Sequence, residues 1–186
     1  MRHNAKLLCH TLCLSLAMLL SACATNPPKQ ATEVASVLDQ ATAKGSIIIA
    51  AQPTEGDLHS LKARGISHVI NLRSDEEMAS LNFAESDLVA MQGIQYQHLP
   101  IAASSDYQPA VLKALQNAVD SNDGKVLVHC ASGGRAAMLY AAYAMQHEGL
   151  SPDAAMRTLA SAGAWPLALE RLTGRKLKVV FAEDDP

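Results

Sequence analysis

From about Gly45 to Gly163, short apolar runs alternate with helical patterns along the chain. The runs are rich in β-branched residues and predict strands, because such residues fit a pleated, half-buried surface. Segments with apolar residues three and four positions apart predict helices between the strands. The expected strands are 46–50, 66–72, 95–101 and 125–129. This alternation indicates an α/β three-layer sandwich, with helices flanking a mainly parallel sheet of about four to five strands.

Residues that favour helix ends set the expected helix boundaries. Thr54, with Asp57 three residues later, can accept a hydrogen bond from the first turn of a helix. Pro109 fits a first turn. The run 135–147 is apolar on nearly all sides, so it predicts a central buried helix that Gly149 ends. The expected helices begin near Thr54, span 75–91, 109–119 and 135–147, and begin again at Ser151-Pro152 and Trp165-Pro166.

The first 22 residues have the pattern of an export signal. Arg2 and Lys6 precede an apolar stretch, 7–20, that is too short to span a membrane. The segment Leu20-Ser21-Ala22-Cys23 resembles the lipobox of bacterial lipoproteins. This resemblance implies cleavage before Cys23 and attachment of lipid, such as palmitate, to that cysteine. The alternative is an ordinary cleavable signal with an incidental cysteine.

The lipobox resemblance also implies a location in the bacterial cell envelope. The domain would lie in the periplasm, and Ala24 in place of an aspartate favours the outer membrane over the inner one. The tether is expected to become helical near 33–43. The expected organisation is a signal peptide (1–22), a lipidated N-terminus and tether (23–44), one domain (45–175) and a C-terminal tail (176–186).

Processing changes both the charge and the cysteine count. Without Arg2 and Lys6 the chain keeps 13 basic and 18 acidic residues, a net charge of −5, and no basic run, which argues against a nucleic-acid partner. Cys9 and Cys13 leave with the signal, so Cys130 is the single free thiol expected in the mature protein. A lone thiol is either buried and inert or reactive.

The stretch His129-Cys130-Ala131-Ser132-Gly133-Gly134-Arg135 favours the reactive thiol. An apolar strand leads into the cysteine, the glycine pair permits close backbone approach, and the arginine opens a helix. This order gathers backbone N–H groups, a helix N-terminus and a guanidinium around one sulfur atom. The pattern predicts an anion pocket with its own nucleophile.

The same loop resembles the phosphate loop of cysteine-dependent protein tyrosine and dual-specificity phosphatases. The segments 51–54, 65–73 and 96–100 resemble more closely a bacterial phosphatase-like domain that also occurs fused to beta-lactamase-like hydrolases. The resemblance covers about 45–163. It implies a dual-specificity-phosphatase-like fold and hydrolysis of phosphate monoesters, on a phosphorylated protein or a small ester, without a cofactor.

The resemblance also implies roles for individual residues. Cys130 would attack phosphorus and form a phosphocysteine, and the planar fork of Arg135 would hold two phosphate oxygens. Asp106 would protonate the leaving group, although a turn or helix cap is the alternative for this residue, and Asp75 is the second candidate acid. Phosphate would be bound by Ala131, Ser132, Gly133, Gly134 and Arg135.

Two positions depart from the resembled phosphatases. Four residues, 131–134, separate Cys130 from Arg135, one fewer than protein tyrosine and dual-specificity phosphatases have, and Ala136 stands where they carry a hydroxyl. The more closely resembled bacterial domain shares the short spacing, so we interpret the loop as a variant phosphatase loop. The short spacing is common in rhodanese-type sulfurtransferases, which leaves open a Cys130 persulfide with thiosulfate held by Arg135. A catalytically inactive, anion-binding lipoprotein is the third possibility.

The histidines do not form the pattern of a known metal site. His68, His98 and His129 lack a histidine–cysteine–aspartate spacing of that kind, so no metal is expected. His129 is expected to pack in its strand, where its ring orients the loop that follows.

Overall fold

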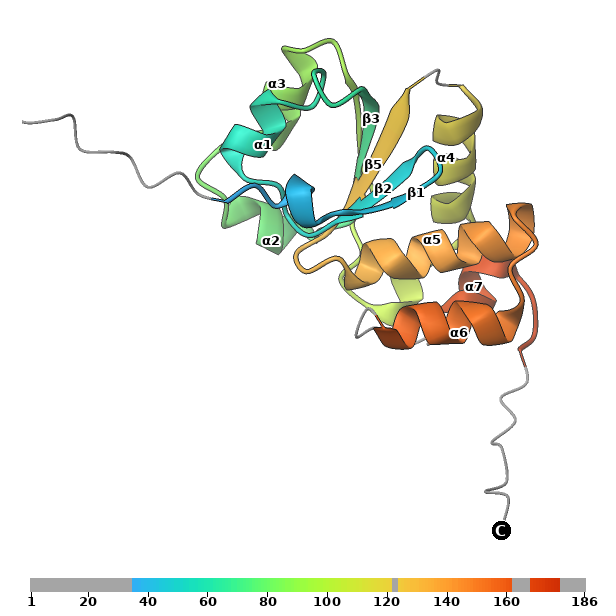
Figure 1. Cartoon of the computed structure of the whole chain (residues 1–186). Coiled ribbons are helices and arrows are strands. Elements are labelled where there is room, and N and C mark those ends of the chain that lie inside the picture. Colours follow the sequence, from blue (N-terminus) through green and yellow to red (C-terminus); the bar gives the residue numbers. More distant parts are fainter. Residues whose placement is uncertain (1–34, 122–123, 162–167, 178–186) are drawn as a thin grey trace, which may run out of the picture. The chain divides into compact units, whose positions relative to one another are not determined.

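The computed structural model describes residues 35–121, 124–161 and 168–177. The described strands form one sheet in the order β1-β2-β5-β3-β4. Figure 1 labels β1, β2, β5 and β3 of this sheet. Only β1 runs antiparallel to its neighbour, and the other neighbouring pairs are parallel. The predicted mainly parallel sheet is therefore confirmed. Its strands are β1 (Thr42–Lys44), β2 (Ile47–Ala50), β3 (Ile66–Asn71), β4 (Gln95–His98) and β5 (Lys125–His129).

Helices cover both faces of this sheet, which confirms the three-layer α/β fold. Val69 and Leu127 belong to one core cluster, together with residues of α1 and α3. Their chain neighbours Ile70 and Val128 belong to a second cluster, with residues of α4 to α7, because alternate strand residues point to opposite faces. The helices are α1 (Glu55–His59), α2 (Asp75–Ala79), α3 (Glu85–Ala90), α4 (Pro109–Asp120), α5 (Gly134–His147), α6 (Pro152–Ser161) and α7 (Leu169–Thr173).

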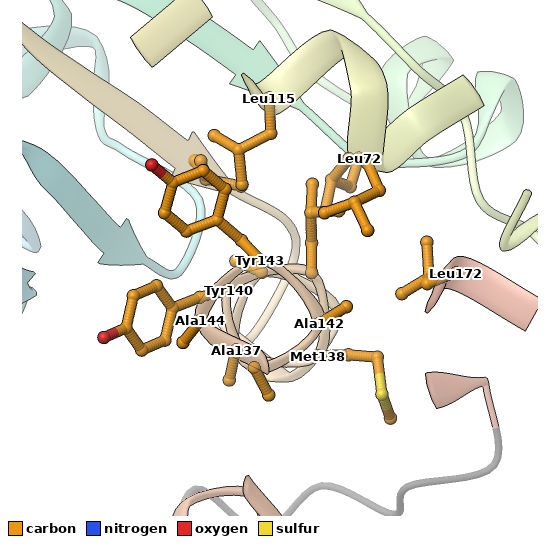
Figure 2. Close-up of a cluster of buried hydrophobic side chains, with 14 of the residues drawn as sticks. Leu72, Leu115, Ala137, Met138, Tyr140, Ala142, Tyr143, Ala144 and Leu172 are labelled. Atoms are coloured by element: carbon orange, nitrogen blue, oxygen red, sulfur yellow. The ribbon is translucent and has the colours of Figure 1, made fainter. Parts of the chain in front are cut away.

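Helix α5 is the centre of the larger core cluster. Its ten consecutive residues 136–145 are all buried, as the apolar pattern predicted. Figure 2 shows Leu72, Leu115 and Leu172 around this helix, each from a different part of the chain. Beyond the helix, Gly149 has a φ of +72°, and the next N–H bonds the carbonyl of Ala144 at 3.0 Å. This glycine ends the helix as expected.

The helix expected over 75–91 is wrong as a single element. The structure has two short helices, α2 and α3, separated by residues 80–84. The hydroxyl of Ser80 bonds the carbonyl of Glu77 at 2.6 Å and competes with helix continuation. Glu85 then opens α3 with its carboxylate buried against His129. A tertiary contact thus decides where the chain breaks.

The helix expected near 33–43 is also wrong over its described part. The structure has a short 3-10 turn, Leu38–Gln40, followed by strand β1, which pairs with β2. Lys44 faces Ile47 across a two-residue turn, and Gly45 has the positive φ of +57° that such a hairpin turn favours. The helix predicted at Trp165-Pro166 lies outside the described residues.

Candidate active site

The loops that follow the four parallel strands lie together at the carboxyl ends of these strands. Ligands of open α/β sheets bind at this end. Strand β5 is the middle strand of the five-stranded sheet, and the loop that follows it begins with Cys130. The N–H of Gln52, after β2, bonds the carbonyl of Ala131 at 3.2 Å. The N–H of Leu72, after β3, bonds the carbonyl of His129 at 2.9 Å. Neighbouring strands thus hold the cysteine loop from both sides.

Cys130 lies at the base of this loop and is only 1% exposed. Its Sγ accepts a hydrogen bond from the N–H of Gly133 at 3.1 Å. Ala131 and Ser132, between them, are exposed, while Gly134 is the first residue of α5. Burial alone would fit an inert thiol, but a backbone N–H directed at sulfur is the contact that stabilises a thiolate.

Gly133 gives the loop its turn into α5. It is the N-cap residue and has a φ of +94°, a left-handed conformation that residues with a Cβ rarely adopt. The glycine pair predicted to permit this turn therefore has a defined function at Gly133. The N–H of Gly133 points back at the Cys130 sulfur, and the φ of Gly133 turns the chain from this peptide into α5.

Arg135 reaches from the first turn of α5 to three other segments. Its Nη1 donates to the carbonyls of Leu72 at 3.1 Å and Ile101 at 2.8 Å. Nη1 and Nη2 also donate to the two carboxylate oxygens of Glu77, each at 2.7 Å. The bonds to Glu77 raise the pKa of Arg135, burial opposes this, and the charge and hydrogen bond of Cys130 raise it further.

These bonds occupy one end of the guanidinium fork, and the Arg135 side chain also forms a hydrogen bond with Cys130. Arginine has five N–H donors in a fixed plane. Among the described residues, the carbonyl and carboxylate partners take the Nη1 and Nη2 end of Arg135. The Nε–H and the second Nη2–H, which are parallel in the guanidinium plane, make none of these bonds. Such a pair matches two oxygens of one phosphate.

Glu77 is a site residue that the sequence reasoning missed. Its carboxylate also accepts the N–H of Ser74 at 2.8 Å, so the residue completes a capping box at the start of α2. Hydrogen bonds from Arg135 lower the pKa of Glu77 to about 2, although burial acts in the opposite direction. The capping signature is visible in Ser74-Asp75-Glu76-Glu77, but nothing in the sequence connects it with an arginine 58 residues later.

Asp106, the expected general acid, ends a short 3-10 turn, Ser104–Asp106. Its Oδ2 accepts the N–H groups of Ala103 at 2.7 Å and Ala102 at 2.9 Å, and these bonds lower the pKa of the carboxyl. The contacts are those of a cap, so the acid role stays a prediction. Asp75, the second candidate, begins α2, and its Oδ1 lies 3.8 Å from Nδ1 of His98.

A cavity of about 410 Å³ opens beside Arg135. This volume lies in the range of small-molecule sites, roughly 300–1,000 Å³. Glu77 and Ser74 line one side, and the loop that carries Asp106 lines another through Ala102 and Ala103. The cavity therefore brings the guanidinium next to the loop predicted to supply the acid.

Three histidines of the domain have different surroundings. His129 is fully buried and its Nε2 lies 2.6 Å from Oε1 of Glu85, which agrees with the packed role expected for it. His98 bonds the carbonyl of Arg73 at 2.8 Å, and His68 is buried in β3. Within the ranges that the structure describes, no group of three histidine, cysteine, aspartate or glutamate residues could hold a metal ion.

The predicted lipid anchor, Cys23, and the signal segment lie outside the described residues. In the part of the chain that the structure covers, no helix is both long and apolar enough to cross a membrane.

The fold and the loop together define a class. An α/β sandwich with cysteine and arginine on the loop after its central parallel strand has the architecture of cysteine-loop phosphatases. The family model "Dual specificity phosphatase, catalytic domain" matches residues 47–169, most of the chain, and the chain belongs to this family. The resemblance of the sequence to phosphatases is thus confirmed.

Individual relatives agree with this assignment. A beta-lactamase hydrolase-like protein from Xylella fastidiosa is 37% identical over 97 residues, which are 51% of this chain and 22% of that protein. One from Agrobacterium fabrum is 32% identical over 96 residues, 50% of this chain and 22% of that protein. The match therefore spans about a fifth of the length of these relatives.

A solved structure shares most of the described domain. Tk-PTP in its active form is 25% identical, with a TM-score of 0.60, and the match covers 73% of this chain and 97% of that one. The likeness supports the three-layer fold found here.

Proposed function

We propose that the protein is a cysteine-dependent phosphatase of the protein tyrosine or dual-specificity type, acting on phosphate monoesters. One observation carries the proposal. Glu77 holds one end of the Arg135 fork through two bonds of 2.7 Å, and both the Arg135 side chain and the Gly133 N–H bond the Cys130 side chain. A thiolate nucleophile and a preorganised oxyanion clamp are what phosphoryl transfer to sulfur requires.

In the proposed first step, the sulfur of Cys130 attacks phosphorus in line with the ester oxygen. An S–P bond forms as the P–O bond to the leaving group breaks. Arg135 and the loop N–H groups of residues 131–134 hold the equatorial oxygens, and Asp106 gives its proton to the departing oxygen. Because two N–H groups now hold Oδ2 of Asp106, this proton transfer requires the 102–106 loop to release the carboxyl.

In the second step, water attacks phosphorus and passes a proton to the carboxylate of Asp106. The S–P bond breaks, and inorganic phosphate leaves with the thiolate regenerated. Ala136 provides no hydroxyl to assist this departure, and it is fully buried in the core cluster that contains Cys130. The second step is accordingly expected to be the slower one.

The deciding experiment is hydrolysis of p-nitrophenyl phosphate by the full-length protein and its Cys130→Ser variant. Turnover that disappears in the variant supports the proposal. Equal turnover in both proteins excludes a cysteine mechanism. If neither turns over, thiosulfate with cyanide tests the sulfurtransferase alternative suggested by the four-residue loop. In that case mass spectrometry should find one added sulfur atom on Cys130. An inactive, anion-binding domain fails both assays.

We also propose that the domain is anchored in the bacterial envelope by lipid on Cys23 and faces the periplasm. The proposal rests on the Leu20-Ser21-Ala22-Cys23 motif. Its substrates would then be phosphorylated proteins or small phosphate esters of that compartment. Labelling with a palmitate analogue should be lost in Cys23→Ser and kept in Cys13→Ser. Labelling that persists in Cys23→Ser would exclude this anchor.

A further inference from the structure

A carboxylate and a histidine are buried together directly behind the nucleophile. Glu85 is 1% exposed and His129 is 0% exposed. Their Oε1 and Nε2 atoms lie 2.6 Å apart. His129 is the last residue of β5, so its backbone leads straight into Cys130. The residue that carries this ring is therefore joined to the nucleophile by one peptide bond.

Among the described side chains, Glu85 is the single hydrogen-bond partner of the His129 ring. Within the part of the chain that the structure describes, Nδ1 of His129 is buried and has no hydrogen-bond partner. The contact with Glu85 is thus the ring's single polar restraint there. Buried polar side chains normally satisfy all their polar atoms. The orientation of His129 depends on one carboxylate, which comes from a helix 44 residues earlier in the chain.

A shell of polar side chains keeps Glu85 charged and in place. Its Oε2 accepts from the side chains of Gln52 at 2.9 Å and Asn71 at 3.4 Å. Asn71 also donates to the hydroxyl of Tyr96, and Arg73 donates to Gln52 at 2.8 Å. These four residues belong to the three segments that carry the family resemblance, so those segments meet around one carboxylate.

Polar and charged groups from several elements face Glu85. Burial raises the pKa of Glu85, but the hydrogen bond and charge of His129, the hydrogen bond of Gln52 and the charge of Arg73 outweigh it and lower the pKa overall. On β4, the negative charge of Glu85 adds to burial in raising the pKa of Tyr96 to about 12. Glu85 is therefore ionised at neutral pH.

Gln52 connects the same carboxylate to the loop. Its side chain bonds Glu85, while its backbone N–H bonds the carbonyl of Ala131. Two separate routes thus lead from Glu85 to the residues on either side of Cys130, one through His129 and one through Gln52.

Stability alone gives a poor reason for this arrangement. A buried carboxylate repays its desolvation cost only when its hydrogen bonds have good geometry, and apolar replacements of buried charged groups are often as stable or more stable. Asp57, the other buried carboxylate described, serves a local purpose, since it accepts from Thr54 at the start of α1. Among the described residues, Glu85 makes no such cap contact, and its bonds to His129 and Gln52 lead to the cysteine loop.

We propose that Glu85 is a positioning residue for the nucleophile: by holding His129, it fixes the backbone from which Cys130 projects and sets the reactivity of the thiol. The inference deepens the proposed phosphatase function and rests on it for its biological meaning. Its test does not require turnover, because alkylation of Cys130 by iodoacetamide reports the reactivity of the sulfur directly.

The test compares Glu85→Gln with Asp57→Asn in the full-length protein. Both changes remove a buried carboxylate charge and keep the size of the side chain. Thermal melts establish that each variant is folded. The rate of Cys130 alkylation is then followed across pH. We expect Glu85→Gln to lower the neutral-pH rate about tenfold, as loss of a charged hydrogen bond does, and to move the pH profile. Asp57→Asn should leave both unchanged.

A double-mutant cycle tests the route through His129. If Glu85 acts through this ring, Glu85→Gln should have little further effect in a His129→Asn background. Independent, multiplying effects would overturn the proposal, as would an unchanged rate and profile in a folded Glu85→Gln protein. If Glu85→Gln does not fold, Gln52→Ala takes its place, with the same expected loss and the same overturning result.

The outcomes separate this inference from the proposed function. Wild-type protein without p-nitrophenyl phosphate turnover contradicts the function and leaves the alkylation test intact. If the wild-type protein turns over p-nitrophenyl phosphate but Glu85→Gln is alkylated at the wild-type rate, the phosphatase function stands and the positioning role is overturned.

Discussion

Glu77 and Arg135 form a bidentate ion pair that joins the first turn of α2 to the first turn of α5. Both N–O distances are 2.7 Å. The carboxylate takes one end of the guanidinium fork. The pair therefore orients the arginine before any substrate arrives, which is the preorganisation that electrostatic catalysis needs.

Replacing Glu77 by glutamine should reduce kcat/KM about tenfold to hundredfold, because a small displacement of a positioned catalytic group is costly. The measurement is steady-state hydrolysis of p-nitrophenyl phosphate. Glu76→Gln, an exposed neighbour in the same helix, is the matched control and should keep wild-type activity. Wild-type kcat/KM in Glu77→Gln would mean that the backbone carbonyls suffice to hold Arg135.

The same pair predicts a pH dependence of stability. The pKa of Glu77 falls from an ordinary value of 4.5 to about 2 on folding. Between these values the unfolded chain binds more protons, so this contribution is complete above about pH 4.5 and is lost as pH falls through about 2. Urea midpoints measured over acidic pH should converge for wild type and Glu77→Gln. Parallel curves would contradict the assignment.

Arg135→Lys should lower kcat/KM about a hundredfold or more. An ammonium can replace the charge but not the two parallel N–H groups, and loss of one oxyanion donor costs roughly that much. The control is Arg157→Lys on the exposed side of α6. Near-normal turnover in Arg135→Lys would reject a bidentate role for the arginine.

Gly133→Ala should damage the loop through backbone strain rather than crowding. An added Cβ would meet Ala50 O at an ordinary 3.6 Å, but the φ of +94° remains unfavourable for alanine. We expect about 1–3 kcal/mol of strain and strongly reduced Cys130 alkylation. Gly56→Ala, in helix α1 with ordinary contacts, is the control and should be neutral or mildly stabilising. A wild-type alkylation rate in Gly133→Ala would show that the cysteine loop does not need this conformation.

Asp106→Asn tests the general acid. If the loop releases this carboxyl for catalysis, the variant should slow phosphotyrosine and alkyl phosphate hydrolysis far more than p-nitrophenyl phosphate, whose leaving group needs little protonation. The pH–rate profile should also lose the limb due to the acid. Asp75→Asn, run in parallel, decides between the two candidates. Unaltered rates in Asp106→Asn would leave its carboxylate as a cap for Ala102 and Ala103.

The sequence predicted what depends on neighbours along the chain. Strand 125–129, the cap at Thr54 and the buried helix after Arg135 each follow from local periodicity or a local hydrogen bond. The same holds for the cysteine loop, whose glycine and arginine act within a few residues.

It did not predict what depends on partners far apart. Glu77 reads as a helix cap and Glu85 as a surface residue of a long helix, because an acidic residue in a helical pattern normally faces water. Their partners, Arg135 and His129, are 58 and 44 residues away. The second of the two helices that replace the expected 75–91 helix begins at the buried Glu85.

The ten buried residues of α5 constrain where the site can change. A helix packed on all sides cannot shift without opening the core. The packing of α5 therefore holds Arg135 and the end of the cysteine loop in position. The opposite wall of the cavity, at Ala102, Ala103 and Ser104, is exposed. Substitutions there alter the shape that a substrate meets at little cost to folding. We therefore expect natural variation and mutagenesis to change the substrate preference most easily at these three residues.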